Sequence, residues 1–128
     1  MSGERVLVVE DNEKNRKLVR DVLQFHGYEV LVAGTAAEGI ALARTEQPSL
    51  ILLDIQLPDL DGMAALRLLR AEPETAGIPI VAVTAYAMSG DRERLLGAGF
   101  TDCLAKPLDI KTFPAAVRRV CERTPEVA

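Results

Sequence analysis

The stretch Leu50-Ile51-Leu52-Leu53-Asp54 places four aliphatic side chains directly before a carboxylate. An unbroken apolar run of this length is typical of a strand that is buried on both faces, as central strands of parallel sheets are. Val6-Leu7-Val8-Val9 repeats the pattern and is followed by Glu10 and Asp11. We therefore expect two buried strands that each deliver acidic side chains at their C-terminal ends.

Further aliphatic runs extend this pattern in both directions along the chain. They cover residues 30–32, 80–83 and, more weakly, 103–105, and segments with the apolar spacing of helices lie between the runs. Alternating strands and helices indicate an α/β fold, in which helices cover both faces of a parallel sheet. The sequence thus predicts five strands.

The order of the strands follows from their polarity. Glu29 and Asp102 adjoin the second and fifth runs, which places these two strands at the edges of the sheet. The order 2-1-3-4-5 satisfies this condition and describes a flavodoxin-like, doubly wound (βα)5 fold. Ligands of such folds bind at the carboxyl ends of the strands at the switch point, here between strands one and three. Asp11 and Asp54 follow those two strands.

Local sequence also predicts where several helices begin and end. Asn12 is expected to cap the first helix and Gly27 to end it. Thr35 and Glu38 have the spacing of a capping box for the second helix. Helical spacing is shown by Leu18, Val22 and Phe25 in the first helix and by Met63, Leu66 and Leu69 or Arg70 in the third. An inward stripe is predicted for the last helix, formed by Ile110, Phe113, Val117 and Val120.

Pro114 conflicts with a regular final helix over residues 109–123, because proline removes a backbone donor and clashes with the preceding turn. We expect this helix to begin late, with Thr112 as its cap, or to have an irregular first turn.

Length and composition favour one globular domain over residues 1–128, with its core at about 4–123. The chain is 48% hydrophobic and 27% charged, and its net charge is −4, so direct binding of nucleic acid or anionic lipid is not expected. No apolar run has the length of a membrane span or signal peptide, which favours a soluble, cytoplasmic protein. Cys103 and Cys121 are predicted to be free thiols.

Charged and polar residues converge at one end of the predicted sheet. Glu10 and Asp11 follow the first strand, Asp54 ends the third, Thr84 ends the fourth and Lys106 follows the fifth. Carboxylates within about 4 Å of each other repel by about 4 kcal/mol per pair at an effective dielectric near 20, so a cation is expected among them. Oxygen ligands favour Mg²⁺, and Mg²⁺ pairs readily with phosphoryl oxygens. We predict a site where Asp54 attacks phosphorus while Lys106 and Thr84 engage the transferred oxygens.

Four segments resemble the receiver domains of two-component response regulators, and the resemblance covers nearly the whole chain. They are Val6-Leu7-Val8-Val9-Glu10-Asp11-Asn12, Leu52-Leu53-Asp54-Ile55-Gln56-Leu57-Pro58, Val83-Thr84-Ala85 and Ala105-Lys106-Pro107. The Glu-Asp-Asn opening and residues 84–88 are similar to DivK-like single-domain regulators and to receivers of hybrid kinases.

This resemblance implies a phosphorylated signalling switch in which Asp54 is the phosphoacceptor. The Mg²⁺ ligands that it implies are the side chains of Asp11 and Asp54, the backbone carbonyl of Gln56 and, through water, Glu10. The phosphoryl group would be bound by Thr84, the Ala85 backbone and Lys106. The donor would be a histidine kinase or histidine phosphotransfer protein that docks near the first helix and the active-site loops, and a downstream protein would read the phosphorylated state.

One position departs from the pattern of the family. Receivers usually carry Tyr or Phe three residues before the lysine, and this chain has Cys103 there. We hypothesise that Tyr86, two residues after Thr84, takes over part of the switch, so Tyr86→Ala should change the phosphorylation-dependent affinity for a partner. Candidate residues of the output face, which the fourth helix, fifth strand and fifth helix would form, are Tyr86, Arg92, Leu95, Cys103 and Arg118.

Two other functions compete with this interpretation. Haloacid-dehalogenase-type phosphatases also use an Asp nucleophile with Mg²⁺, Thr and Lys. Their motif is Asp-x-Asp, with a second carboxylate two residues after the nucleophile, whereas this chain has Gln56 at that position. An amide cannot deprotonate the hydrolytic water, so a phosphorylated Asp54 should persist as a signal. The second alternative is a degenerate receiver that binds partners without phosphorylation; Cys103 favours it weakly and the intact acidic site opposes it.

Overall fold

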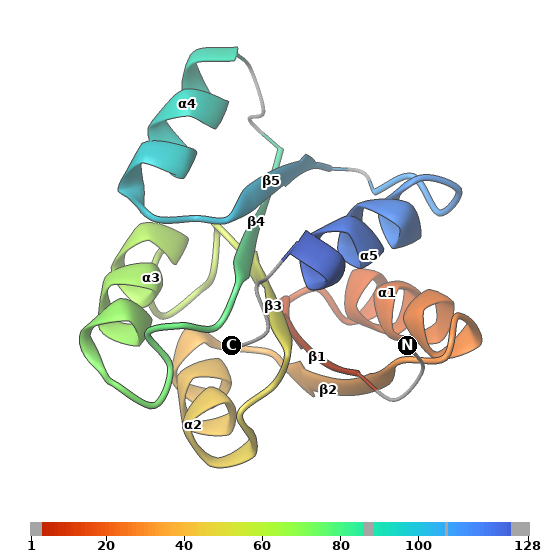
Figure 1. The fold of residues 1–128 in the computed structure, drawn as a ribbon, viewed down its shortest axis with the longest axis horizontal. Coiled ribbons are helices and arrows are strands. Elements are labelled where there is room, and N and C mark those ends of the chain that lie inside the picture. The colour runs from red at the N-terminus through yellow and green to blue at the C-terminus, as the bar shows by residue number, and fades with distance from the viewer. Residues whose placement is uncertain (1–3, 86–88, 107, 124–128) are drawn as a thin grey trace.

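Strands and helices alternate along the chain in the computed structural model, which describes residues 4–85, 89–106 and 108–123 (Figure 1). Within these residues the strands are β1 (Arg5–Val9), β2 (Glu29–Ala33), β3 (Leu50–Asp54), β4 (Ile80–Thr84) and β5 (Asp102–Ala105). The helices are α1 (Glu13–Phe25), α2 (Ala36–Glu46), α3 (Gly62–Ala71), α4 (Ser89–Ala98) and α5 (Phe113–Arg123). The five predicted strands are therefore confirmed.

All strand pairs are parallel, and the order is β2-β1-β3-β4-β5, as predicted. Every residue of β3 and β4 is buried, whereas β2 and β5 are partly exposed edges. The register pairs Val9 with Leu53, Asp54 with Val83, and Thr84 with Ala105. The ends of neighbouring strands consequently lie side by side at one edge of the sheet.

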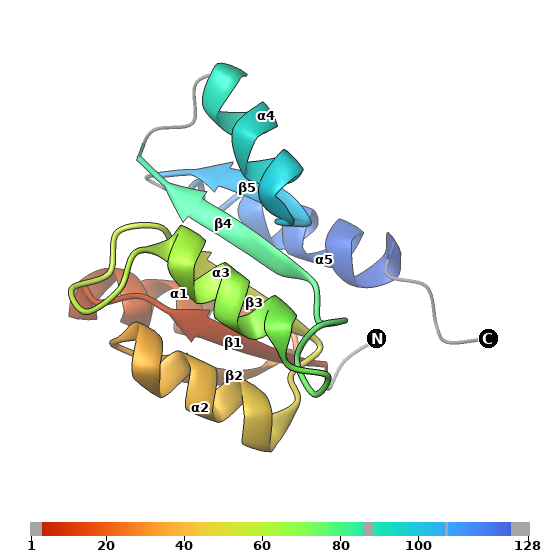
Figure 2. The same cartoon turned by 90° about the vertical axis from the view of Figure 1, so that its left-hand side faces the viewer.

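Helices cover both faces of the sheet, with α1 and α5 on one side and α2, α3 and α4 on the other (Figures 1 and 2). Alternate strand residues divide between the two layers: Val6 and Val8 pack towards α1 and α5, and Leu7 and Val9 towards the other helices. Across the described part of the chain, every helix is too short or too polar to cross a lipid bilayer.

The apolar spacing that the sequence shows in α1 matches the buried face only at Val22, which is partly buried and packs against the core. Val19 and Leu23 are buried against the sheet, whereas Leu18 is 45% and Phe25 is 86% exposed. Apolar residues occupy adjacent positions of this helix, so two stripes rotated by about 100° both satisfy a helical period, and only packing against the sheet selects one. Ile110 is also exposed, because it precedes α5, while the other three residues of that predicted stripe are buried.

The predicted helix ends are largely confirmed. The Asn12 side chain accepts a hydrogen bond from the Asn15 amide at 3.0 Å, and Gly27 follows α1 with a φ of 92°. Thr35 accepts from the Glu38 amide at 3.2 Å. The reciprocal half of the capping box is displaced by one residue, because the Glu38 carboxylate accepts from the Gly34 amide and not from the Thr35 amide.

The late start of the final helix is also confirmed. Helix α5 begins at Phe113, and the Ala116 amide donates to the Thr112 carbonyl at 3.2 Å. Pro114 therefore lies in the first turn, where a backbone donor has no partner within the helix and its loss costs nothing.

Side chains cover the outer edge of β5. Arg92 of α4 donates to the Cys103 carbonyl at 3.2 Å and to the Asp102 carboxylate at 2.8 Å. The same carboxylate oxygen of Asp102 accepts from the Cys103 amide at 2.8 Å. Arg92 and Asp102 thus occupy both backbone polar groups of Cys103 and connect α4 to the edge strand.

Candidate functional site

Three carboxylates meet where β1 and β3 end. Glu10 and Asp11 directly follow β1, and Asp54 is the last residue of β3. Each offers an oxygen, and these oxygens all lie within 4.8 Å of one another. Glu10 and Asp54 are buried, while Asp11 is exposed, so the cluster opens to solvent on one side. The structure therefore brings together the three acidic residues that the sequence singled out.

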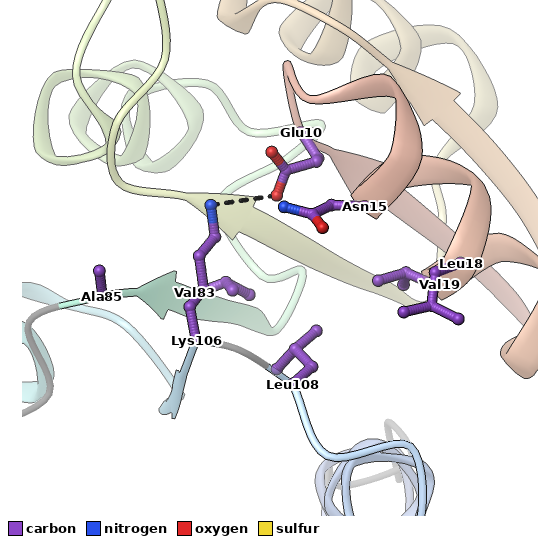
Figure 3. A pocket seen from close by; sticks show the side chains of 8 residues that line it. All are labelled: Glu10, Asn15, Leu18, Val19, Val83, Ala85, Lys106 and Leu108. Carbon is purple, nitrogen blue, oxygen red and sulfur yellow. Dashed lines mark ion pairs between the residues drawn. The ribbon is translucent and has the colours of Figure 1, made fainter.

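The ammonium of Lys106 lies against two of these carboxylates. Its Nζ is 2.7 Å from Asp54 Oδ2 and 3.2 Å from Glu10 Oε1. Figure 3 shows the ion pair between Lys106 and Glu10. Burial acts to lower the pKa of Lys106, but the hydrogen bond and charge of Asp54, together with Glu10, outweigh burial and raise it. Lys106 is therefore held as a cation.

Glu10 has a raised pKa, mainly because it is buried and also because Asp54 is negative. The Asn12 amide, which donates to Glu10 at 3.0 Å, and Lys106 act in the opposite direction. The negative charge of Glu10 and Asp54 is thus only partly compensated, and a further cation at the cluster would stabilise their ionised forms.

Asp54 is oriented by contacts on both of its carboxylate oxygens. Oδ2 faces Lys106, and Oδ1 accepts from the Gln56 amide at 2.9 Å. The loop that follows is closed by a 2.7 Å hydrogen bond from the Gly62 amide to the Ile55 carbonyl. A side chain at position 62 would place its Cβ 2.7 Å from Ile55 Cα, so this close approach requires glycine.

Thr84 is the last residue of β4, and Ala85 directly follows the strand and lines the same cavity as Glu10. Thr84 is 3% exposed, and its carbonyl accepts from the Lys106 amide at 2.8 Å, which fixes the start of the lysine side chain next to β4. Ala85 and Lys106 line a cavity of about 310 Å³. Two of the three predicted phosphoryl-binding residues thus line one hollow together with Glu10, and the third, Thr84, directly precedes Ala85.

The same cavity extends over the N-terminal half of α1 (Figure 3). Its other lining residues are Glu10, Asn15, Leu18, Val19, Val83 and Leu108. Its wall is mostly apolar, with Glu10, Asn15 and Lys106 as the polar groups. Sequence reasoning missed Asn15, although its place in the first turn of a helix that starts at the site was a usable signal.

Sequence reasoning also missed two residues that support the site. Arg16 donates to the Glu10 carbonyl at 2.9 Å, and Asp59 accepts from the amides of Ala36 and Ala37 at 2.9 and 3.0 Å. The partners of Asp59 are more than 20 residues away in the sequence, so no short-range motif could indicate this contact.

The predicted output residues have different surroundings. Tyr86 lies outside the described residues. Cys103 is buried, and burial raises the pKa of its thiol; Cys121 is half-buried, and burial raises its pKa to about 11. Both are free cysteines, as predicted. Leu95 is 3% exposed and packs in the same core cluster as Cys103, so its assignment to the partner-facing surface is wrong.

Comparisons with known proteins agree with this geometry. The model of the response regulator receiver domain family matches residues 6–118. The polar-differentiation response regulator DivK of Brucella ovis is 41% identical over 113 residues, which cover 88% of this chain and 92% of the relative. A CheY-like receiver domain protein from Methanospirillum hungatei has 30% identity and a TM-score of 0.86, and the match covers 96% of this chain and 97% of that structure.

The receiver domain of a sensor histidine kinase from Pseudomonas aeruginosa is also similar, with 36% identity and a TM-score of 0.81. The match covers 96% of this chain and 98% of that structure, which has a magnesium ion coordinated in its active site cleft.

Proposed function

Because the chain belongs to the response regulator receiver domains of two-component signalling, we propose that Asp54 accepts the phosphoryl group, with Mg²⁺ bound beside it. The observation that carries this proposal is the position of Asp54, which is buried beside two other carboxylates and 2.7 Å from the Lys106 ammonium. We further propose that residues 1–128 form a single receiver domain.

The donor set fits Mg²⁺. All three side chains of the cluster offer carboxylate oxygens, which are the ligands that this hard cation prefers. Asp11 and Asp54 would hold the ion directly, with the Gln56 carbonyl, and Glu10 would act through water. When bound, Mg²⁺ neutralises charge on the carboxylates and on the phosphoryl oxygens, which lowers the repulsion between them.

Phosphoryl transfer exchanges one bond at phosphorus for another. The carboxylate of Asp54 forms the new oxygen–phosphorus bond as the nitrogen–phosphorus bond of a phosphohistidine breaks, and the histidine nitrogen keeps that electron pair. Lys106 moves from its contact with Asp54 to the transferred oxygens, where its raised pKa keeps it cationic. The Thr84 hydroxyl and the Ala85 amide are the other donors to the phosphoryl group.

The phosphorylated protein acts as a signal because its hydrolysis is slow. Haloacid-dehalogenase-type phosphatases carry a second acid two residues after the nucleophile. This chain has Gln56 there, and its amide side chain cannot accept a proton from water. The protein therefore catalyses its own phosphorylation and slow dephosphorylation only. Sustained turnover of a small phosphate ester would instead show that it is a phosphatase.

Signalling by phosphoryl transfer implies two protein partners, one that donates the phosphoryl group and one that recognises the phosphorylated form. A histidine kinase or histidine phosphotransfer protein would dock against α1 and Leu108, because the apolar cavity wall there adjoins Lys106. A downstream protein would bind the phosphorylated form. The cytoplasmic location and the absence of direct nucleic-acid binding stay predictions.

The first experiment is incubation with a small acyl phosphate and Mg²⁺, followed by intact-mass measurement. We expect the mass of one phosphoryl group to be added to the wild type and to an Asp61→Asn control, but not to Asp54→Asn. Asp61 is a suitable control because it is an exposed carboxylate that caps α3. A protein that gains no Asp54-dependent mass would be a phosphorylation-independent interaction module.

A further inference from the structure

The N-terminus of α2 is capped by residues from two separate parts of the chain. Thr35 accepts from the Glu38 amide, whereas the amides of Ala36 and Ala37 donate to Asp59. The two oxygens of Asp59 each accept one of these bonds, at 2.9 and 3.0 Å. A helix leaves its first amides without internal partners, and here a carboxylate from the loop after β3 supplies two of the missing acceptors.

That loop begins at the phosphoacceptor. Ile55 still pairs with β4, since its amide donates to the Val83 carbonyl at 3.1 Å, and the Gln56 amide donates to Asp54. At the other end, Asp61 caps α3 by accepting from the Ala64 amide at 2.9 Å. Asp59 lies between these fixed ends, three residues after Gln56, and connects the loop to a different helix.

The geometry of Asp59 holds both partners in place. Two hydrogen bonds to successive backbone amides define the orientation of the carboxylate as well as its distance from α2. The same bonds lower the pKa of Asp59, because the amides donate to the ionised carboxylate. Asp59 is exposed, so replacing it removes the two bonds without leaving a cavity in the core.

We infer that Asp59 is a positioning residue for the metal site, which fastens the 55–61 loop to α2 and so holds the Gln56 carbonyl ready to bind Mg²⁺. This inference rests on the proposed function. Without the two bonds the loop samples more backbone conformations, and Mg²⁺ binding must then order it. Loss of a contact that supports a metal ligand typically weakens metal affinity by about 10- to 100-fold.

The test compares Asp59→Ala with Thr35→Ala in Mg²⁺ titrations followed by calorimetry. Thr35→Ala is a matched control, because it removes a capping bond from the same end of α2 and leaves the loop attached. Both substitutions should lower the melting temperature to a similar extent. We expect only Asp59→Ala to raise the Kd for Mg²⁺, by about tenfold. Asp59→Asn keeps one acceptor oxygen, so its Kd for Mg²⁺ should lie between those of Asp59→Ala and the wild type.

Two further measurements separate positioning from loss of stability. The Gln56 amide should exchange hydrogen faster in Asp59→Ala than in Thr35→Ala. Phosphorylation of Asp59→Ala by acyl phosphate should be slow at low Mg²⁺ and should recover at saturating Mg²⁺. An unchanged Mg²⁺ Kd in Asp59→Ala and Asp59→Asn would overturn the inference, as would an equal weakening in Thr35→Ala.

These outcomes are distinct from failure of the proposed function. A wild type that binds Mg²⁺ but gains no phosphoryl group would overturn phosphoryl acceptance, while the Kd of the Asp59 variants would still decide the role of Asp59. A wild type that binds no Mg²⁺ would overturn the inference and the metal site together.

Discussion

The ammonium of Lys106 faces the buried carboxylates of Glu10 and Asp54, with the carboxylate of Asp11 within reach of both. Among the described residues, Lys106 is the cation that forms ion pairs with these carboxylates, so the three acidic groups outnumber their paired cation. The same imbalance that attracts Mg²⁺ also makes the metal-free site depend on Lys106. The contribution of this single residue to folding can therefore be measured separately from its role in phosphoryl binding.

Replacing Lys106 by Met should lower the free energy of unfolding in metal-free buffer by about 2 kcal/mol at pH 7, because two buried carboxylates lose their cation. This is less than for fully buried pairs, since 24% of the Lys106 side chain is exposed. Urea denaturation measures the change. Added Mg²⁺ should stabilise Lys106→Met more than the wild type. Lys111→Met, at an exposed position, is the control and should change little.

The pH dependence of this difference has a defined sign. The folded-state pKa of Lys106 is raised above its ordinary value of 10.5, so its stabilising effect is fully present below that value. It is lost as the pH rises through the higher folded-state pKa. The difference between wild type and Lys106→Met should therefore be constant from about pH 7 to 9 and decrease in more alkaline buffer. A difference that instead grew with pH would contradict this assignment.

The sequence correctly predicted the positions of those candidate residues that lie where strands end, while their roles stay predictions. Asp54 and Thr84 are the last residues of β3 and β4, and parallel pairing alone brings such positions to one edge. Asp59 and Arg16 were missed because each acts on a backbone group of another segment, and the sequence carries no periodic trace of such contacts.

Helix α3 illustrates how a single position constrains an element. Gly62 begins the helix in contact with the backbone that leaves β3, and a Cβ there would lie 2.7 Å from Ile55 Cα. Backbone atoms cannot move aside as the end of a flexible side chain can. The start of α3 and the loop after Asp54 are therefore fixed relative to each other.

Gly62→Ala should accordingly lower the free energy of unfolding by about 2 kcal/mol, the cost typical of overpacking. Gly97→Ala is the matched control, because Gly97 lies in α4 and a Cβ there would meet no atom within 4 Å. Alanine in an open helical position should raise the free energy of unfolding by about 0.5–1 kcal/mol. Thermal or urea unfolding of both variants provides the comparison. If the free energy of unfolding changed in the same direction in both, the close contact between Gly62 and Ile55 would not be what requires glycine.

At the scale of elements, prediction was better for strands than for the faces of helices. Both faces of the strand from Leu50 to Leu53 are buried, so its place in the core could be predicted without knowing which elements pack against it. The orientation of α1 depends on the sheet beneath it. Leu18 and Val19 are equally suitable apolar residues, and only the packed structure shows that Val19 is the buried one.

The arrangement of the whole molecule followed from a few polar residues at strand edges. Glu29 and Asp102 indicated which strands lie outermost, and the observed order confirms this. The apolar core is divided by the sheet into two clusters, one under α1 and α5 and one under α2, α3 and α4. What the sequence could not indicate is how α4 is attached to β5, because that contact depends on a side chain that reaches across from another element.

That attachment also affects how the molecule behaves in a crowded solution. An open strand at the margin of a sheet offers its backbone as a template on which a strand of a second molecule can add, and chains that join in this way aggregate. On β5 the amide and carbonyl of Cys103 are already engaged by Asp102 and Arg92. An incoming strand would have to displace both contacts, so they oppose the addition of a second strand at Cys103.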